Sequence, residues 1–125
     1  MTIAYWCVLA TVIMPLLLAG IAKAGAGRPY DNHKPREFLA SLEGYQQRAN
    51  WAQQNAYEAF APFAAAVIIA HQLNLAQATL DTYALTFVAA RVLYSLCYIK
   101  DWALLRSLAW TVGFACVIGL FVAAA

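Results

Sequence analysis

The chain has 125 residues, of which 64% are apolar and only 11% are charged, and its mean hydropathy is +0.62. Soluble domains carry about 25% charged residues, so this composition predicts a protein of the lipid bilayer and excludes a disordered chain. The net charge of +2, from 8 Lys and Arg against 6 Asp and Glu, is too small for a nucleic-acid-binding surface, so no nucleic acid is expected as a partner.

The first predicted element is a membrane helix over residues 3–24, which begins with the apolar run from Ile3 to Ala22. About 20 residues, each rising 1.5 Å, cross the ~30 Å hydrocarbon core of a bilayer. A cleavable signal peptide is the alternative, but no Lys or Arg precedes the run, and the run is too long. Pro15 is tolerated inside a membrane helix when neighbouring groups satisfy the carbonyl that it frees.

Three further helices are predicted. Residues 23–37 contain glycine and proline breakers and are expected to form a loop, after which a helix is predicted over residues 38–72. Its first half is polar, so it is expected to begin in water or at the headgroups and to carry a polar stripe into the bilayer. Apolar helices are predicted over 79–99 and 102–124. The length predicts a single domain over residues 1–125. One long and two short connections favour an all-α integral membrane protein built as an antiparallel four-helix transmembrane bundle.

Lysine and arginine near the ends of the spans predict the orientation of this bundle. The first loop holds four of these residues, the third connection holds Lys100 with Arg106 close behind, and the second connection holds none. Cytoplasmic loops carry the excess of positive charge. Loops one and three are therefore expected to face the cytoplasm, with both termini on the other side of the membrane.

Four ionisable residues fall within the predicted membrane helices. A charge near the bilayer centre costs at least about 2.5 kcal/mol, so it persists only when it is paired or functional. These residues are Arg48, Glu58, Arg91 and Arg106.

Helical spacing gathers polar residues on facing surfaces of the second and third helices. Residues 48, 51, 55, 58 and 62 share one face, as do residues 87, 91, 94 and 98. Glu58 and Arg91 lie at similar distances from the second connection, so they are predicted to be partners. The same reasoning places Asn55 near Tyr98, and Arg48 near Arg106.

The resulting polar seam favours an anionic or carboxylate-bearing ligand. Guanidinium, amide and phenol groups bind carboxylates, whereas metal ions prefer clustered carboxylates, imidazoles or thiolates, so no metal site is predicted. Two alternatives remain: Glu58 and Arg91 form an interhelical lock, and Arg48 and Arg106 extend to the headgroups. Cys7, Cys97 and Cys116 are isolated in apolar runs and are interpreted as small hydrophobic residues.

The order of these polar residues resembles the MAPEG family, the membrane-associated proteins of eicosanoid and glutathione metabolism. The resemblance rests on the string from Arg48 to Phe63, which contains Asn55, Glu58 and Pro62, on Arg91 to Tyr98, and on Leu105 to Ser107. It extends over nearly the whole chain. The resemblance implies a homotrimer with glutathione bound between neighbouring protomers near the cytoplasmic side, and a lipophilic small-molecule substrate that arrives from the membrane lipids.

The resemblance also implies roles for nine residues. Glu58 accepts from the glutathione amino group, Arg91 and Arg48 hold its carboxylates, and Tyr94 and Tyr98 donate to its backbone. Arg106 with Ser107 stabilises the thiolate as the catalytic pair. Gln53 and Asn55 complete the pocket, and Gln53, which points away from the Glu58 face, serves the site of a neighbouring protomer.

The implied function is that of a glutathione transferase or peroxidase acting on lipophilic electrophiles. Free thiols ionise with a pKa of about 8.5, and only the thiolate attacks an electrophile well, which explains an arginine beside the sulfur. The alternative is a non-catalytic lipid-ligand-binding or scaffold protein of the same family, which Trp51 and Ala59 favour because other members carry an arginine and a tyrosine there. The expected location is a bacterial inner membrane, with periplasmic termini.

Overall fold

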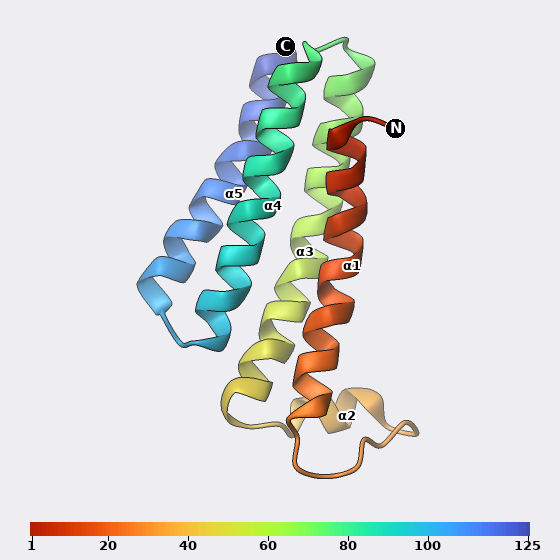
Figure 1. Cartoon of the computed structure of the whole chain (residues 1–125), viewed down its shortest axis with the longest axis vertical. Coiled ribbons are helices and arrows are strands. Elements are labelled where there is room, and N and C mark those ends of the chain that lie inside the picture. Colours follow the sequence, from red (N-terminus) through yellow and green to blue (C-terminus); the bar gives the residue numbers. More distant parts are fainter.

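Helices form every regular element of this chain, which is described over all residues 1–125 by a computed structural model (Figure 1). The elements are α1 (Ile3–Ala24), α2 (Pro35–Ala40), α3 (Gly44–Gln72), α4 (Gln77–Ile99) and α5 (Ala103–Ala124). Three of them, α1, α4 and α5, are long and apolar enough to cross a membrane, which indicates an integral membrane protein. The fourth long helix, α3, is too polar along its first half to qualify on composition.

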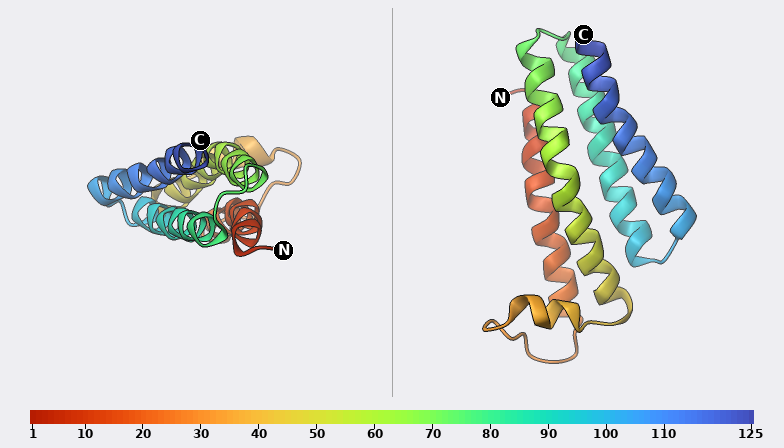
Figure 2. Two further views of the ribbon diagram at one scale, coloured as in Figure 1. Left: turned by 90° about the horizontal axis from the view of Figure 1, so that it is seen from above. Right: turned by 180° about the vertical axis from the view of Figure 1, so that it is seen from behind.

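The four long helices lie side by side with alternating directions. Helices α3 and α4 pack against each other, and each also contacts α1 and α5, which lie on opposite sides of this central pair (Figure 2). Both termini lie at the same end as the α3–α4 turn, whereas α2 lies near the other end (Figure 1). The predicted antiparallel order of the long helices therefore matches the observed arrangement.

The prediction of one unbroken helix over residues 38–72, preceded by a loop to residue 37, is wrong. Pro35 begins α2, since proline is favoured at the first helical position, where its missing N–H is not needed. The chain then turns before α3, which starts at Gly44 with a positive φ of 62° that glycine adopts at little cost. Phe38 and Leu42 are buried together against Ala22 of α1, so apolar burial stabilises this break.

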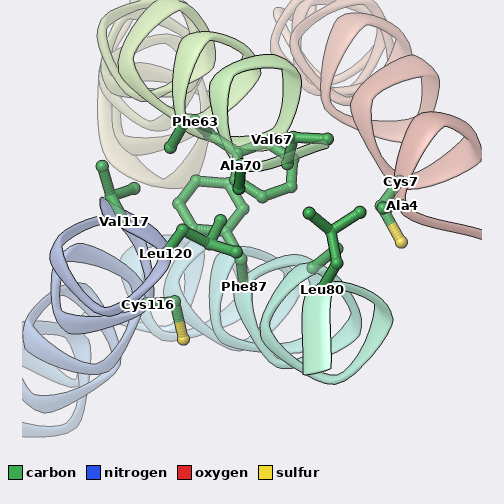
Figure 3. Packing of buried hydrophobic residues seen from close by; sticks show 12 residues of the cluster. Ala4, Cys7, Phe63, Val67, Ala70, Leu80, Phe87, Cys116, Val117 and Leu120 are labelled. Atoms are coloured by element: carbon green, nitrogen blue, oxygen red, sulfur yellow. The ribbon is translucent and has the colours of Figure 1, made fainter. Parts of the chain in front are cut away.

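The main hydrophobic core lies toward the end that holds the termini and receives side chains from all four long helices (Figure 3). At its centre, Phe63 of α3 stacks on Phe87 of α4 with 3.9 Å between ring centroids, and Phe63 is 0% exposed. All three cysteines are buried and free, as expected for small hydrophobic residues.

Polar contacts also connect the helices near the two ends of the molecule. The carboxylate of Asp81 on α4 accepts from the backbone N–H of Ala4 at 2.9 Å, so it caps the start of α1 from a neighbouring helix. Near the other end of the molecule, the side-chain amide of Gln46 donates to the carbonyl of Gly25. This second contact joins the C-terminal end of α1 to the first turn of α3, the two ends of the segment that connects these helices.

Candidate functional site

Asn55 of α3 stands between the two charged residues predicted to pair. The Arg91 guanidinium donates through Nη2 to Asn55 Oδ1 at 2.7 Å, and Asn55 Nδ2 donates to Glu58 Oε2 at 3.0 Å. The predicted direct partnership of Glu58 and Arg91 is therefore wrong, because the amide fills the space between carboxylate and guanidinium. An amide fits here because it offers an acceptor to one neighbour and a donor to the other.

The polar face of α4 continues this network as a row of two aromatic rings with a guanidinium group at each end, the second of which comes from α5. Arg91 Cζ lies 4.2 Å from the centroid of the Tyr94 ring, and the Tyr94 and Tyr98 rings meet edge to face at 5.6 Å. At the far end, Arg106 of α5 lies over the Tyr98 ring at 4.4 Å. The negative faces of the two rings hold the two guanidinium groups in place without neutralising them.

A shallow polar hollow of about 370 Å³ lies between α3 and α4 beside this row. We call it the polar hollow; it is lined by Trp51, Gln54, Asn55, Glu58, Tyr94 and Tyr98. Arg91 and Arg106 flank it with two positive charges, and Glu58 contributes one negative charge. The net positive balance suits an anionic ligand.

A second cavity adjoins the polar hollow and is mostly apolar. This apolar cleft has a volume of about 210 Å³ and lies between α3, α4 and α5. Its lining consists of Asn55, Glu58, Ala59, Pro62, Phe87, Arg91, Trp110, Gly113, Phe114 and Val117. Asn55 and Glu58 line both cavities, so a ligand in one lies next to a ligand in the other.

The remaining predicted site residues lie apart from the polar hollow or at its edge. Arg48 donates through Nε to the Ile99 carbonyl at 3.0 Å, which holds it at the end of α4. The side-chain oxygen of Gln53 is buried without a hydrogen-bond partner within the chain, on a different face of α3. Ser107 is exposed, and its hydroxyl donates to the Ala103 carbonyl at 3.1 Å, so its proton is already used within α5.

The structure thus brings together Asn55, Glu58, Arg91, Tyr94 and Tyr98, with Arg106 at the edge. Sequence reasoning missed Gln54, and it also missed the contribution of α5 to the apolar cleft. Trp110, Gly113 and Phe114 carry no charge and lie in an apolar span. Their spacing of three and four places them on one helix face, which was the available signal.

These features define an all-helical membrane protein with a cationic polar site next to an apolar one. The model of the MAPEG family matches residues 3–125, so this chain belongs to the MAPEG family. The family includes glutathione-dependent transferases and peroxidases as well as non-catalytic members. No curated protein and no solved structure matches the chain.

Proposed function

We propose that this protein binds glutathione and acts as a transferase or peroxidase in which the glutathione thiolate attacks a lipophilic electrophile. The observation that carries the proposal is the junction of the polar hollow with the apolar cleft at Asn55 and Glu58. Glutathione is a polar anion and the electrophile is apolar. Two adjoining cavities of opposite character hold such a pair in contact.

The polar groups of glutathione match the side chains around the polar hollow. Glu58 accepts from the ammonium group, Arg91 attracts a carboxylate, and the hydroxyls of Tyr94 and Tyr98 donate to the peptide. Arg48 of α3, which contacts the last residue of α4, attracts the second glutathione carboxylate where the ligand extends beyond the polar hollow. Charge-assisted contacts of this kind are about twice as strong as neutral hydrogen bonds.

Arg106 is the group that stabilises the thiolate. Its guanidinium makes no hydrogen bond or ion pair within the chain and rests on the Tyr98 ring, so its donors are free for an incoming anion. A cation beside a thiol favours the ionised form, which is the nucleophile. Ser107 assists only after its hydroxyl leaves the Ala103 carbonyl.

The proposed assembly is a homotrimer in a bacterial inner membrane, with α3 as the fourth spanning helix and glutathione bound between protomers. The unpaired buried oxygen of Gln53 supports an interprotomer site, because a buried acceptor needs a donor from another molecule. The loop between α1 and α3 and the α4–α5 connection face the cytoplasm, and the termini face the periplasm.

A non-catalytic lipid-ligand-binding role is the second candidate. Trp51 supports it, because this ring lies 6.2 Å from the Tyr98 ring and takes up part of the polar hollow. Ala59, in the wall of the apolar cleft, adds no polar group for glutathione.

Conjugation of glutathione to 1-chloro-2,4-dinitrobenzene by the detergent-purified protein separates these candidates. We expect a rate well above the uncatalysed background. We also expect Arg106→Ala to abolish turnover while glutathione binding by calorimetry persists, with Arg36→Ala at an exposed position of α2 as the unaffected control. Intact protein without activity would refute the enzyme proposal, and loss of glutathione binding in Arg106→Ala would refute the thiolate role.

A further inference from the structure

The connection between α1 and α3 carries a polar cavity of its own. We call it the loop cavity; it has a volume of about 360 Å³ and is lined by residues of the connection and of α2, among them Arg28, Asp31, Lys34, Glu37, Phe38 and Ser41. Pockets for small ligands begin at about 300 Å³. The loop cavity shares no residue with the polar hollow or the apolar cleft, so it is separate from the proposed glutathione site.

Two cations and two carboxylates line the loop cavity, but only one cation contacts a carboxylate. Lys34 Nζ lies 3.3 Å from Glu37 Oε2, which is the one ion pair within the chain. Arg28 and Asp31 therefore remain as opposite charges without an ionic partner. Asp31 Oδ1 accepts from the backbone N–H of His33 at 2.9 Å, and Asp31 Oδ2 makes no hydrogen bond. A cavity with one free cation and one free carboxylate fits a ligand that carries one charge of each sign.

Arg28 is held in position for such a ligand. Its Nη2 donates to the Ser41 hydroxyl, and its Cζ lies 4.9 Å from the centroid of the Phe38 ring. Phe38 is only 7% exposed and clusters with Ala22 of α1, so its ring is a fixed support for the guanidinium. The other N–H groups of Arg28 make no hydrogen bond within the chain. A preorganised guanidinium with free donors is well suited to bind the oxygens of a phosphate.

The loop cavity lies where the chain leaves the membrane. Helix α1 is apolar enough to span the bilayer and ends at Ala24, only four residues before Arg28. The connection that carries α2 also projects beyond the side of the helix bundle (Figure 1 and Figure 2). Phospholipid headgroups surround a membrane protein at this depth, and each of them carries a phosphate. In a zwitterionic headgroup, a cationic group accompanies that phosphate.

The aromatic rings of this region distinguish between two kinds of zwitterionic headgroup. A quaternary ammonium, as in phosphocholine, is bound by the faces of aromatic rings. The Phe38 ring already holds Arg28. The Tyr30 ring holds Lys23, whose Nζ lies 4.2 Å from the ring centroid. A primary ammonium, as in phosphoethanolamine, instead donates hydrogen bonds to a carboxylate, which Asp31 supplies.

We propose that the loop cavity binds the phosphoethanolamine headgroup of a lipid in the surrounding membrane, with the phosphate on Arg28 and the ammonium group on Asp31. The acyl chains of this lipid stay in the bilayer and keep its headgroup at a high local concentration, so weak contacts are sufficient for binding. A phosphoglycerol headgroup has no cation for Asp31 and leaves that carboxylate unpaired. The bound lipid fastens the connection between α1 and α3 to the membrane surface.

Native mass spectrometry of the detergent-purified protein measures this selectivity. Phosphatidylethanolamine, phosphatidylcholine and phosphatidylglycerol with the same acyl chains are titrated separately, and the dissociation constants of the first bound lipid are compared. We expect phosphatidylethanolamine to bind at least about tenfold more tightly than the other two, since a hydrogen bond to a charged group is worth that factor or more. Equal binding of the three lipids would overturn the inference.

Two variants of the loop cavity test the assigned contacts. Asp31→Asn removes the negative charge but keeps an acceptor for the His33 N–H. The cavity then has one positive charge in excess, so phosphatidylglycerol should bind more tightly than phosphatidylethanolamine, which reverses the order of the wild type. Arg28→Gln should weaken phosphatidylethanolamine binding by at least about tenfold. If Arg28→Gln distorts the connection, Asp31→Asn still decides, because an unchanged order in that variant would overturn the inference.

Arg36→Gln is the matched control. Arg36 lies at an exposed position of α2, makes no ion pair and does not line the loop cavity. Its replacement changes the net charge of the connection by the same amount as Arg28→Gln, so phosphatidylethanolamine affinity should stay unchanged. A loss as large as that in Arg28→Gln would show that the lipid responds to overall charge, and would overturn the site.

Soluble phosphoethanolamine distinguishes a lipid from a free ligand. At equal concentration it should not displace phosphatidylethanolamine, because it lacks the acyl chains that concentrate the headgroup at the membrane surface. Displacement at equal concentration would show that the loop cavity takes a free phosphate ester, and would overturn the lipid assignment. All of these measurements are made without glutathione, so they decide this inference whatever the outcome for the proposed function.

Discussion

Replacement of Asn55 by alanine removes the one side-chain hydrogen bond of a nearly fully buried arginine. The lost contact is the 2.7 Å bond from Arg91 Nη2 to Asn55 Oδ1. Hydrogen bonds to charged groups contribute about 1.5 to 3 kcal/mol, and leaving a buried donor unpaired costs a similar amount. We therefore expect Asn55→Ala to lower the free energy of unfolding by about 2 to 3 kcal/mol.

A double-mutant cycle isolates this contact from the rest of the network. The second variant is Arg91→Met, which keeps most of the side-chain length but removes the charge. Reversible unfolding in mixed detergent micelles, followed by circular dichroism, gives the free energy for the wild type, the two single variants and the double variant. We expect a coupling energy of about 1.5 to 3 kcal/mol. Gln54→Ala, at an exposed neighbour without a side-chain hydrogen bond, should change stability by less than about 0.5 kcal/mol.

Additive effects of the two substitutions, within about 0.5 kcal/mol, would refute this reasoning. Additivity would mean that the Arg91 guanidinium finds other acceptors once Asn55 is gone, and that Asn55 is not the bridge between α3 and α4. A large coupling energy would instead establish the amide as a stabilising polar link between α3 and α4.

Three further predictions concern the fold and its orientation. Phe63→Ala should lower the free energy of unfolding by about 3 to 5 kcal/mol, mainly through the cavity left beside Phe87, and unchanged stability would contradict this prediction. Asp81→Ala should destabilise the protein by about 1 kcal/mol and increase amide hydrogen exchange at the start of α1. Exchange that increases equally in all helices would show that Asp81 does not cap α1. A phosphatase that needs disulfides, fused after Ala125, should be active in a bacterial host, because the C-terminus is expected in the periplasm. Activity of the same reporter when inserted after Asn32 instead would reverse the proposed topology.

Apolar runs predicted most of the fold, because lipid imposes simple rules on helix length. The spans that became α1, α4 and α5 have boundaries within a few residues of those predicted. The break before α3 was not predictable from the same rules. It depends on the burial of Phe38 and Leu42 against α1, which is a tertiary contact, and on a glycine with positive φ, which in the sequence is one glycine among six.

The candidate site was predictable in its polar half only. Helical spacing identified the facing surfaces with Asn55, Glu58, Arg91 and Tyr98, since ionisable residues are conspicuous in an apolar chain. The similar depths of Glu58 and Arg91 along their helices did not distinguish a direct ion pair from a bridge through the Asn55 amide, because that choice depends on side-chain geometry. The apolar cleft escaped notice because its α5 wall has the same composition as a surface that faces lipid.

The hydrogen bond between Gln46 and the Gly25 carbonyl has a practical consequence for the segment that it closes. The C-terminal end of α1 and the N-terminal end of α3 lie together at the two ends of that segment, so the length of the segment contributes little to the free energy of folding. Each doubling of the length of a flexible loop costs only about 0.6 kcal/mol. Residues 29–33 lie at exposed or half-buried positions outside any helix. An epitope tag or a fluorophore attachment site placed there should leave the helices intact, which makes this loop the natural point for labelling the protein in a native membrane.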